Sequence, residues 1–267
     1  MLQHMMETSE SHIQQVTVPL LIVALYFCLR SCEYLQTPNG HLKKTKPIVL
    51  GGIRFFRKGT SLPFSDPDLA FADFVSITIF DQKNGEKFQS VHVGRATLKD
   101  NSLCCVRNLA LVCKRVASYS NTTPVLLRKI SLYQAVNGTF SHISSDFVIT
   151  FLRKGAESMG FHRLGFKPTE IGTHSIRSGG AMAYYLIPGM SDSQVKFFGR
   201  WKSLAFLNYI RSQVDRFHSG FSNQIAAQPH FQQIPDLDPS QIDLMRHNKS
   251  PDYLLFGAAS DRDARLR

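Results

Sequence analysis

The sequence predicts an α+β fold, mostly helical, with a small antiparallel three-stranded sheet at one side. Three segments rich in β-branched and aromatic residues lie close together in the chain, at 48–56, 74–80 and 88–93. Longer segments with helical spacing of apolar residues lie before and after them. With 43% apolar residues among 267, the chain has enough apolar side chains for a packed core.

The chain opens with residues 1–14, which are largely polar and which we expect to form a tail. Residues 16–29 are mostly apolar. This segment is shorter than the ~20 residues that a membrane span needs, so we favour a buried helix, with a membrane-associated helix as the minor alternative. Pro19 suits the first turn of a helix that would run to about Leu35, before a turn at residues 38–40.

The predicted strands follow this helix. The first strand covers 48–56, with a possible bulge at Gly51 and Gly52. The second and third strands, 74–80 and 88–93, flank the segment DQKNGEK, whose Asn-Gly pair favours a tight hairpin. Helical spacing then predicts helices over 103–119 and 143–159, with loop-like residues between them.

The last helices lie between residues 172 and 211. Thr173 would cap a helix from His174 to about Leu186, and Ser191 or Asp192 would cap the next one, ending at Gly199. A final helix would start near Ser203. After about residue 221 the chain is rich in Gln and Pro, which predicts a poorly ordered tail over 222–267. Between the two predicted tails, residues 15–221 are expected to form one folded domain.

Charge favours a polyanionic partner for this domain. The net charge is +11, and residues 22–221 hold 26 Lys and Arg against 12 acids. Nucleic acid is the leading candidate, although a solvated basic surface without a partner predicts the same charge. The five Cys form no C-x-x-C pair, which argues against a zinc ribbon or a disulfide framework and indicates reduced thiols in an intracellular protein.

One stretch, residues 172–211, carries a possible reaction centre. His174 and Arg177 are three residues apart and would share one face of a helix, and Tyr209 follows later in the stretch. Arg offers a fork of donors to phosphate oxygens, His exchanges a proton near neutral pH, and Tyr is able to attack phosphorus. Together these three side chains suit a phosphodiester.

At these residues the chain resembles the tyrosine recombinases, also called phage-type integrases. HSIRSGGA resembles their His-x-x-Arg box, and FGRWKSLAFLNYIR resembles the box with the nucleophile. The GRWKS variant is most similar to recombinases of Crypton-type eukaryotic mobile elements. FCLRSCEYL resembles the family's first Arg box, although an ordinary ion pair at a helix end would give the same pattern.

The resemblance implies DNA strand breakage and rejoining through a 3′-phosphotyrosine, as in site-specific recombination or DNA integration. Tyr209 would be the nucleophile, His174 a base or hydrogen-bond donor, and Lys83 the general acid at the hairpin tip, with Lys87 as the fallback. The remaining implied residues are the phosphate clamps Arg30 and Arg177, the supporting Glu33 and the indole N–H donor Trp201. Such chemistry uses neither a metal nor a cofactor.

The resemblance also implies double-stranded DNA as the partner, a homo-oligomer assembled on it, and the nucleus as the compartment. Basic residues expected to contact the DNA are Lys43, Lys44, Lys46, Arg200 and Lys202. Family members usually carry an N-terminal helical clamp domain, whereas here only residues 1–14 precede the first matching helix. The alternative is therefore a non-catalytic DNA-binding protein, or a truncated relic, derived from a mobile-element recombinase.

Overall fold

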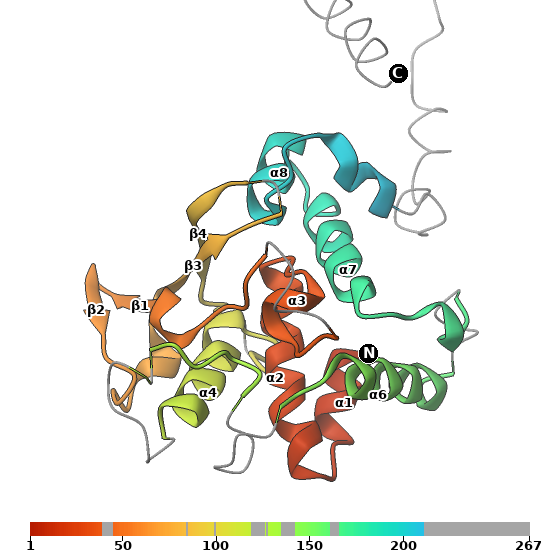
Figure 1. Cartoon of the computed structure of the whole chain (residues 1–267), viewed down its shortest axis with the longest axis horizontal. Helices are drawn as coiled ribbons and strands as arrows, with labels where there is room; N and C mark the ends of the chain where they lie inside the picture. Colours follow the sequence, from red (N-terminus) through yellow and green to blue (C-terminus); the bar gives the residue numbers. More distant parts are fainter. Residues whose placement is uncertain are drawn as a thin grey trace, which may run out of the picture. The chain divides into compact units, whose positions relative to one another are not determined.

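A computed structural model gives the fold of the chain and describes residues 1–38, 45–83, 85–98, 100–118, 126, 128–134, 142–160 and 166–210. The chain divides into two compact units, 1–213 and 214–267, and all described residues belong to the first. The expected tail over 222–267 lies outside the described residues. The described part mixes helices with one small antiparallel sheet, so the predicted α+β class is confirmed (Figure 1).

The sheet has four strands in the order β2-β1-β3-β4, one more than the sequence predicted. Its strands are β1 (Ile53–Arg57), β2 (Thr60–Leu62), β3 (Phe74–Asp81) and β4 (Lys87–Gly94). The extra strand, β2, is short and pairs with β1 through a turn at Lys58 and Gly59, both of which have positive φ. One face of the sheet is buried by alternate apolar residues, namely Ile53, Phe55, Val75, Ile77, Ile79, Val91 and Val93.

The first predicted strand starts later than expected. Leu50–Gly52 form a short 3₁₀ helix, η2, in place of a strand with a bulge. The backbone N–H of Gly51 donates to the carbonyl of Arg128 (2.8 Å), and a Cβ on Gly51 would lie only 2.9 Å from that oxygen. Close packing against this neighbouring loop explains Gly51, and a Cβ on Gly52 would lie 2.8 Å from the Thr78 carbonyl oxygen of β3.

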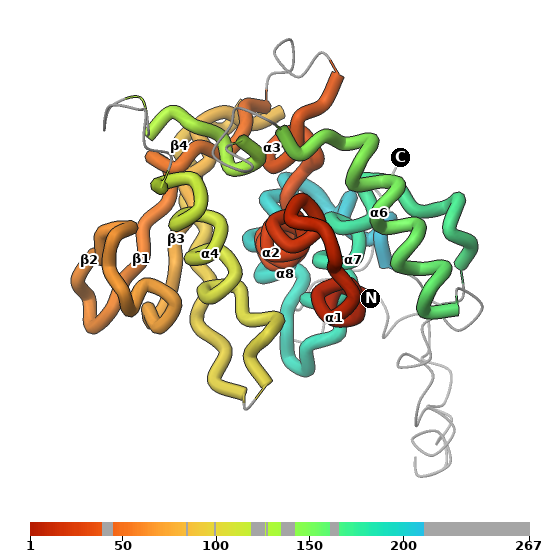
Figure 2. The backbone as a smooth tube through the Cα atoms, turned by 90° about the horizontal axis from the view of Figure 1, so that it is seen from below, coloured from red at the N-terminus to blue at the C-terminus, as the bar shows by residue number. Residues whose placement is uncertain are grey.

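Helix α2 (His12–Tyr26) lies at the centre of the helical part, between α4 (Cys105–Ala117) and α7 (His174–Tyr185), as both views show (Figures 1 and 2). Every residue from Thr17 to Ala24 is buried, which confirms the predicted buried helix. None of the helices among the described residues is both long enough and apolar enough to cross a membrane.

Two expectations about this N-terminal region were wrong. Residues 1–14 are not simply a polar tail, because α1 (Leu2–Glu7) buries Leu2 and Met5 against α2 and α6 (Ser145–Ser158). Helix α2 also begins before Pro19, at His12. A capping box explains this start, since Ser11 and Gln14 exchange side-chain to backbone hydrogen bonds of 3.4 and 3.2 Å.

Nor does α2 run to Leu35. It ends at Tyr26, and a separate short helix, α3 (Ser31–Tyr34), follows. Between them Cys28 adopts a left-handed backbone conformation with φ of 44°, which ends the helix.

Most of the other predicted helices are confirmed, with small shifts at their ends. Helices α4 and α6 fall within the predicted segments 103–119 and 143–159. Helix α7 starts at His174, and α8 (Asp192–Gly199) is capped by Ser191, whose hydroxyl accepts from the Gln194 N–H. Within the described residues there are also the short 3₁₀ helices η3 (Leu69–Phe71), η5 (Pro168–Glu170) and η6 (Leu204–Tyr209).

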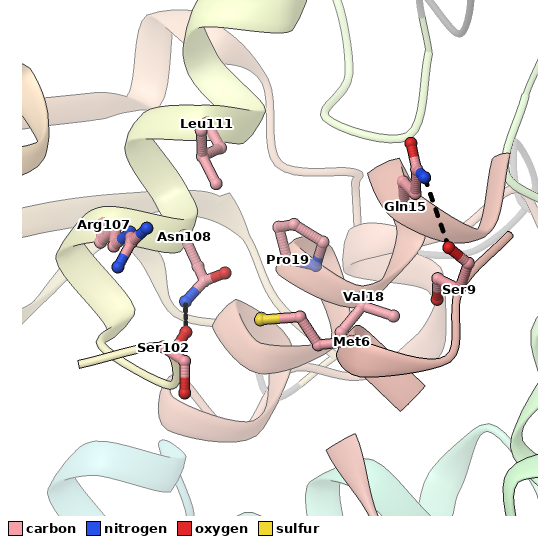
Figure 3. A pocket seen from close by; sticks show the side chains of 9 residues that line it. All are labelled: Met6, Ser9, Gln15, Val18, Pro19, Ser102, Arg107, Asn108 and Leu111. Atoms are coloured by element: carbon pink, nitrogen blue, oxygen red, sulfur yellow. Dashed lines mark hydrogen bonds between the residues drawn. The ribbon is translucent and has the colours of Figure 1, made fainter. Parts of the chain in front are cut away.

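Pro19 borders a pocket of about 200 Å³ between α1, α2 and the start of α4 (Figure 3). Asn108 holds the α4 side of the pocket by donating to the Ser102 carbonyl at 2.7 Å. The residues that line it are Met6, Ser9, Gln15, Val18, Pro19, Ser102, Arg107, Asn108 and Leu111. None of the predicted site residues is among them.

Candidate functional site

The first turn of α7 brings the His-Arg pair into place. His174 is the first residue of α7, and Arg177 lies three residues later. The buried hydroxyl of Tyr34 on α3 donates to the Thr173 carbonyl at 3.4 Å and so ties the start of α7 to α3. His174 stays exposed, whereas Arg177 is only 2% exposed. The two side chains therefore meet different environments although both belong to the same helical turn.

His174 and Tyr209 are in direct contact. The imidazole Nε2 and the Tyr209 hydroxyl are 2.8 Å apart, and the ring centroids are separated by 5.2 Å. Tyr209 is the last residue of η6, which Ser203 caps by accepting from the Ala205 N–H at 3.3 Å. The sequence predicted a helix from Ser203, and the structure gives a tighter 3₁₀ helix that ends at the tyrosine.

Arg177 is held by backbone carbonyls and an aromatic ring. Its Nη1 donates to the Cys28 carbonyl and its Nη2 donates to the Gly199 carbonyl at 2.7 Å. The Trp201 ring lies 4.4 Å from the guanidinium carbon, a cation–π geometry. The same indole is 5.8 Å from the Tyr209 ring, measured between centroids. Trp201 thus lies between the buried arginine and the candidate nucleophile.

Arg30 lies in the break between α2 and α3, and Glu33 lies in the first turn of α3. Arg30 is the N-cap of α3, and its backbone N–H donates to Glu33 Oε2 at 2.8 Å. The Arg30 side chain is 20% exposed, and its Nη1 contacts Glu33 Oε1 at 3.1 Å. Glu33 is fully buried, so this carboxylate depends on its ion pairs.

Arg200 does not take the position expected of it. We predicted a DNA contact, but its side chain is fully buried and lies against Glu33. Nη1 and Nη2 each contact a different carboxylate oxygen of Glu33 at 2.9 Å. The physical reason is the C-terminus of α8, where Arg200 has φ of 58° and turns inward toward the α2–α3 break.

The site holds more positive than negative charge. Arg30, Arg177 and Arg200 surround one carboxylate, Glu33, and all but Arg30 are buried. Burial lowers the pKa of Arg177, and the charges of Arg30 and Arg200 lower it further. Such mutual repulsion between cations would be relieved by an anion at this place.

The pKa values of Glu33 and His174, the two titrating groups beside these arginines, are both lowered. Burial favours protonation of Glu33, but Arg200 and Arg30 outweigh it and lower the pKa of that carboxyl. Partial burial lowers the pKa of His174, as do the positive charges of Arg177 and Arg30. At neutral pH Glu33 is therefore ionised and His174 is neutral, so its imidazole is able to accept a proton from Tyr209.

The predicted lysines lie at the edge of this cluster or outside it. Lys83 is exposed at the tip of the β3–β4 hairpin, next to Gln82, whose Oε1 accepts from Arg200 Nη1 at 3.5 Å. Lys202 is exposed and pairs with Glu86 of the same hairpin at 3.6 Å. Lys46 is exposed between α3 and η2, while Lys43 and Lys44 lie outside the described residues.

Sequence reasoning missed several residues that build the site. Cys28 gives its carbonyl to Arg177 and to Arg200, the latter at 3.3 Å. Gly180 has no side chain to keep α7 from α2, and a Cβ there would collide with the Leu25 carbonyl oxygen. The Gly179-Gly180 pair inside a helix is a signal of close packing that the sequence offered. Nothing in the sequence marked Cys28.

Comparisons with protein-family models and with curated proteins found no match. A search of solved structures found the integrase of the transposon Tn1549, in complex with transposon right-end DNA. The sequence identity is 10% and the TM-score is 0.43. The match covers 85% of this chain but 63% of the integrase chain, which is less than two thirds of its length.

Proposed function

We propose that this chain breaks and rejoins DNA strands through a tyrosine nucleophile, in the manner of a tyrosine recombinase acting in DNA recombination or integration. The observation that carries the proposal is the 2.8 Å contact between the Tyr209 hydroxyl and the His174 imidazole, beside a cluster with excess positive charge. A hydroxyl in contact with a neutral base, which itself lies near cationic side chains, is an arrangement for attack on a phosphodiester.

In the proposed reaction Tyr209 loses its proton to His174 and its oxygen forms a bond to the scissile phosphorus. The bond from phosphorus to the 5′ oxygen breaks, and Lys83 gives that oxygen a proton. The products are a 3′-phosphotyrosine and a free 5′ hydroxyl. Attack by a second 5′ hydroxyl on the phosphotyrosine reverses the step, so the bond energy is retained and neither ATP nor a metal is required.

The cations have distinct parts in this scheme. Arg30 is partly exposed, so its guanidinium is placed to meet a non-bridging phosphate oxygen. Arg177 contributes positive charge from beneath the Trp201 ring, and that ring supports both Arg177 and Tyr209. Removing one such preorganised cation would slow cleavage by roughly 10²–10³. Lys46 and Lys202 would hold the DNA backbone outside the reaction centre.

Wider features of the proposal follow from the same chemistry. We assign catalysis to residues 15–221 and no catalytic part to 222–267. Double-stranded DNA is the partner, and exchange of strands requires more than one nucleophile, hence a homo-oligomer on DNA. As the recombinase of a mobile element in a eukaryotic host, the protein would act in the nucleus.

The direct test uses a nicked suicide DNA substrate, from which the 5′-hydroxyl fragment diffuses away after cleavage. We expect a protein–DNA band that survives SDS and is lost in Tyr209→Phe. Tyr185→Phe is the matched control, because it removes a hydroxyl from α7 in the same region without touching the His174 contact. A band that persists in Tyr209→Phe would refute Tyr209 as nucleophile.

One observation favours the second candidate, a DNA-binding protein that does not cleave. Both terminal nitrogens of Arg177 donate to backbone carbonyls, and the side chain is 2% exposed, so a phosphate would have to compete for these donors. This candidate predicts DNA affinity that falls by about 0.9 log units per log unit of salt for each phosphate neutralised, without any covalent adduct.

A further inference from the structure

Glu33 divides its contacts unequally between two arginines. Arg200 reaches both carboxylate oxygens at 2.9 Å, whereas the Arg30 side chain reaches only Oε1, at 3.1 Å. Arg200 and Glu33 are fully buried, and Arg30 keeps 20% of its side chain exposed. The bidentate pair is therefore internal, and the arginine with the weaker pairing faces solvent.

Arg200 is fixed from several directions. Its backbone N–H donates to the Phe197 carbonyl at 3.2 Å as α8 ends, with φ of 58°. Its Nη2 also approaches the carbonyls of Phe27 and Cys28, at 3.4 and 3.3 Å, where α2 ends. The guanidinium thus joins the end of α8 to the α2–α3 break that carries Arg30.

The pairing is not arranged for stability alone. Among the described residues, the Arg200 Nε is buried and finds no hydrogen-bond partner. A buried ion pair with an unsatisfied donor is a poor way to gain folding free energy, since desolvation offsets the Coulomb attraction. A role in ordering the neighbouring groups gives a better account of this arrangement.

We propose that Arg200 is a positioning residue for the phosphate site, which engages both oxygens of Glu33 and thereby leaves the other N–H groups of the Arg30 guanidinium available to DNA phosphate. This proposal rests on the proposed function and names a further residue of the same site. Without Arg200, Glu33 would be a buried carboxylate with Arg30 as its remaining charged partner. Arg30 would then turn toward Glu33, and its charge would be neutralised within the protein.

The test compares Arg200→Met, the double variant Arg200→Met/Glu33→Gln, and Arg107→Met, which removes one charge on α4 outside the site. Arg200 has a left-handed backbone conformation, and adopting this conformation costs Met and Arg the same free energy. The substitution therefore changes the side chain without adding backbone strain. We expect Arg200→Met to form the SDS-stable adduct roughly 10²-fold more slowly per folded molecule. The double variant should recover most of this rate, because no buried carboxylate is left to hold Arg30.

Two further readouts separate positioning from simple misfolding. In an Arg30→Met background, Arg200→Met should cause no additional loss of rate. With a scissile methylphosphonate, which carries no negative charge for Arg30 to neutralise, the Arg200→Met defect should shrink. A rate loss of equal size on both substrates, or one that the double variant does not recover, would overturn the proposal.

The positioning role stays testable if wild type forms no adduct and the proposed function fails. DNA affinity is then measured against salt. Withdrawal of Arg30 in Arg200→Met should reduce the slope of log K against log salt by about 0.9, and the double variant should restore it. If Arg200 instead contacted phosphate itself, the double variant would keep the reduced slope, which would refute the proposal. An unchanged slope in Arg200→Met would also refute it.

Discussion

Substituting alanine at Gly180 and, separately, at its neighbour Gly179 should shift stability in opposite directions. A Cβ on Gly180 would collide with the Leu25 carbonyl oxygen and lie 2.9 Å from the Cys28 sulfur. A Cβ on Gly179 would meet only the Leu25 Cδ1, at 3.4 Å, which is the movable end of a side chain. Both glycines lie inside α7, so helix propensity changes equally in the two variants.

The magnitudes follow from two terms. Replacing Gly by Ala inside a helix stabilises by about 0.5–1 kcal/mol. Forcing an extra methyl into close-packed backbone costs about 1–3 kcal/mol. Gly179→Ala should therefore gain up to about 1 kcal/mol, and Gly180→Ala should lose up to about 2.5 kcal/mol, because its Cβ would meet backbone that is unable to move aside. For a domain of this size, each kcal/mol moves the Tm by about 2–4 °C.

Thermal unfolding followed by circular dichroism measures both shifts, and urea unfolding gives the free energies independently. Gly180→Ala should also slow adduct formation, because moving α7 away from α2 disturbs the bond from Arg177 to the Cys28 carbonyl. Equal Tm shifts in the two variants would refute the reasoning. They would mean that α7 moves freely against α2 and that Gly180 is not a packing requirement.

Three other predictions concern the charged and aromatic groups. The lowered pKa of His174 keeps its imidazole neutral at pH 7, so the rate of adduct formation should fall only below about pH 6.5. His174→Gln should abolish this fall in rate at acidic pH and slow adduct formation by about 10²–10⁴. A fall at acidic pH that persists in the variant would contradict the assignment. Trp201→Ala should lower the free energy of unfolding in urea by about 1 kcal/mol more than Trp201→Phe, since Phe still offers a ring face to Arg177. Equal losses of unfolding free energy in the two variants would exclude the cation–π contact. Because the pKa of Glu33 is lowered in the folded state, its ion pairs stabilise the fold above the unfolded pKa of about 4.3. This stabilisation is lost as pH falls through the folded pKa. Glu33→Gln should therefore reduce the loss of stability at acidic pH, as measured by unfolding midpoints from about pH 3 to 7.

Local patterns were sufficient to predict most of the secondary structure. Alternation of apolar residues marked β3 and β4, because such strands bury one face, and the Asn-Gly pair marked the turn between them. Helical spacing marked α4 and α6 in the same way. Where the prediction was wrong, as at Pro19 and at β2, a capping box or a short edge pairing outweighed the pattern of the longer segment.

The sequence by itself determined the reactive residue types and their order, since His174, Arg177 and Tyr209 lie within one short stretch. Only the tertiary structure decided which of them touch and which arginine faces solvent. Arg30 and Arg200 are far apart in the chain and indistinguishable as residue types, yet one is partly exposed and the other buried against Glu33. The difference in exposure between the two arginines comes from the packing of α7 at Gly180 and from the left-handed backbone at Cys28 and Arg200. These features fix the directions in which neighbouring side chains leave the backbone.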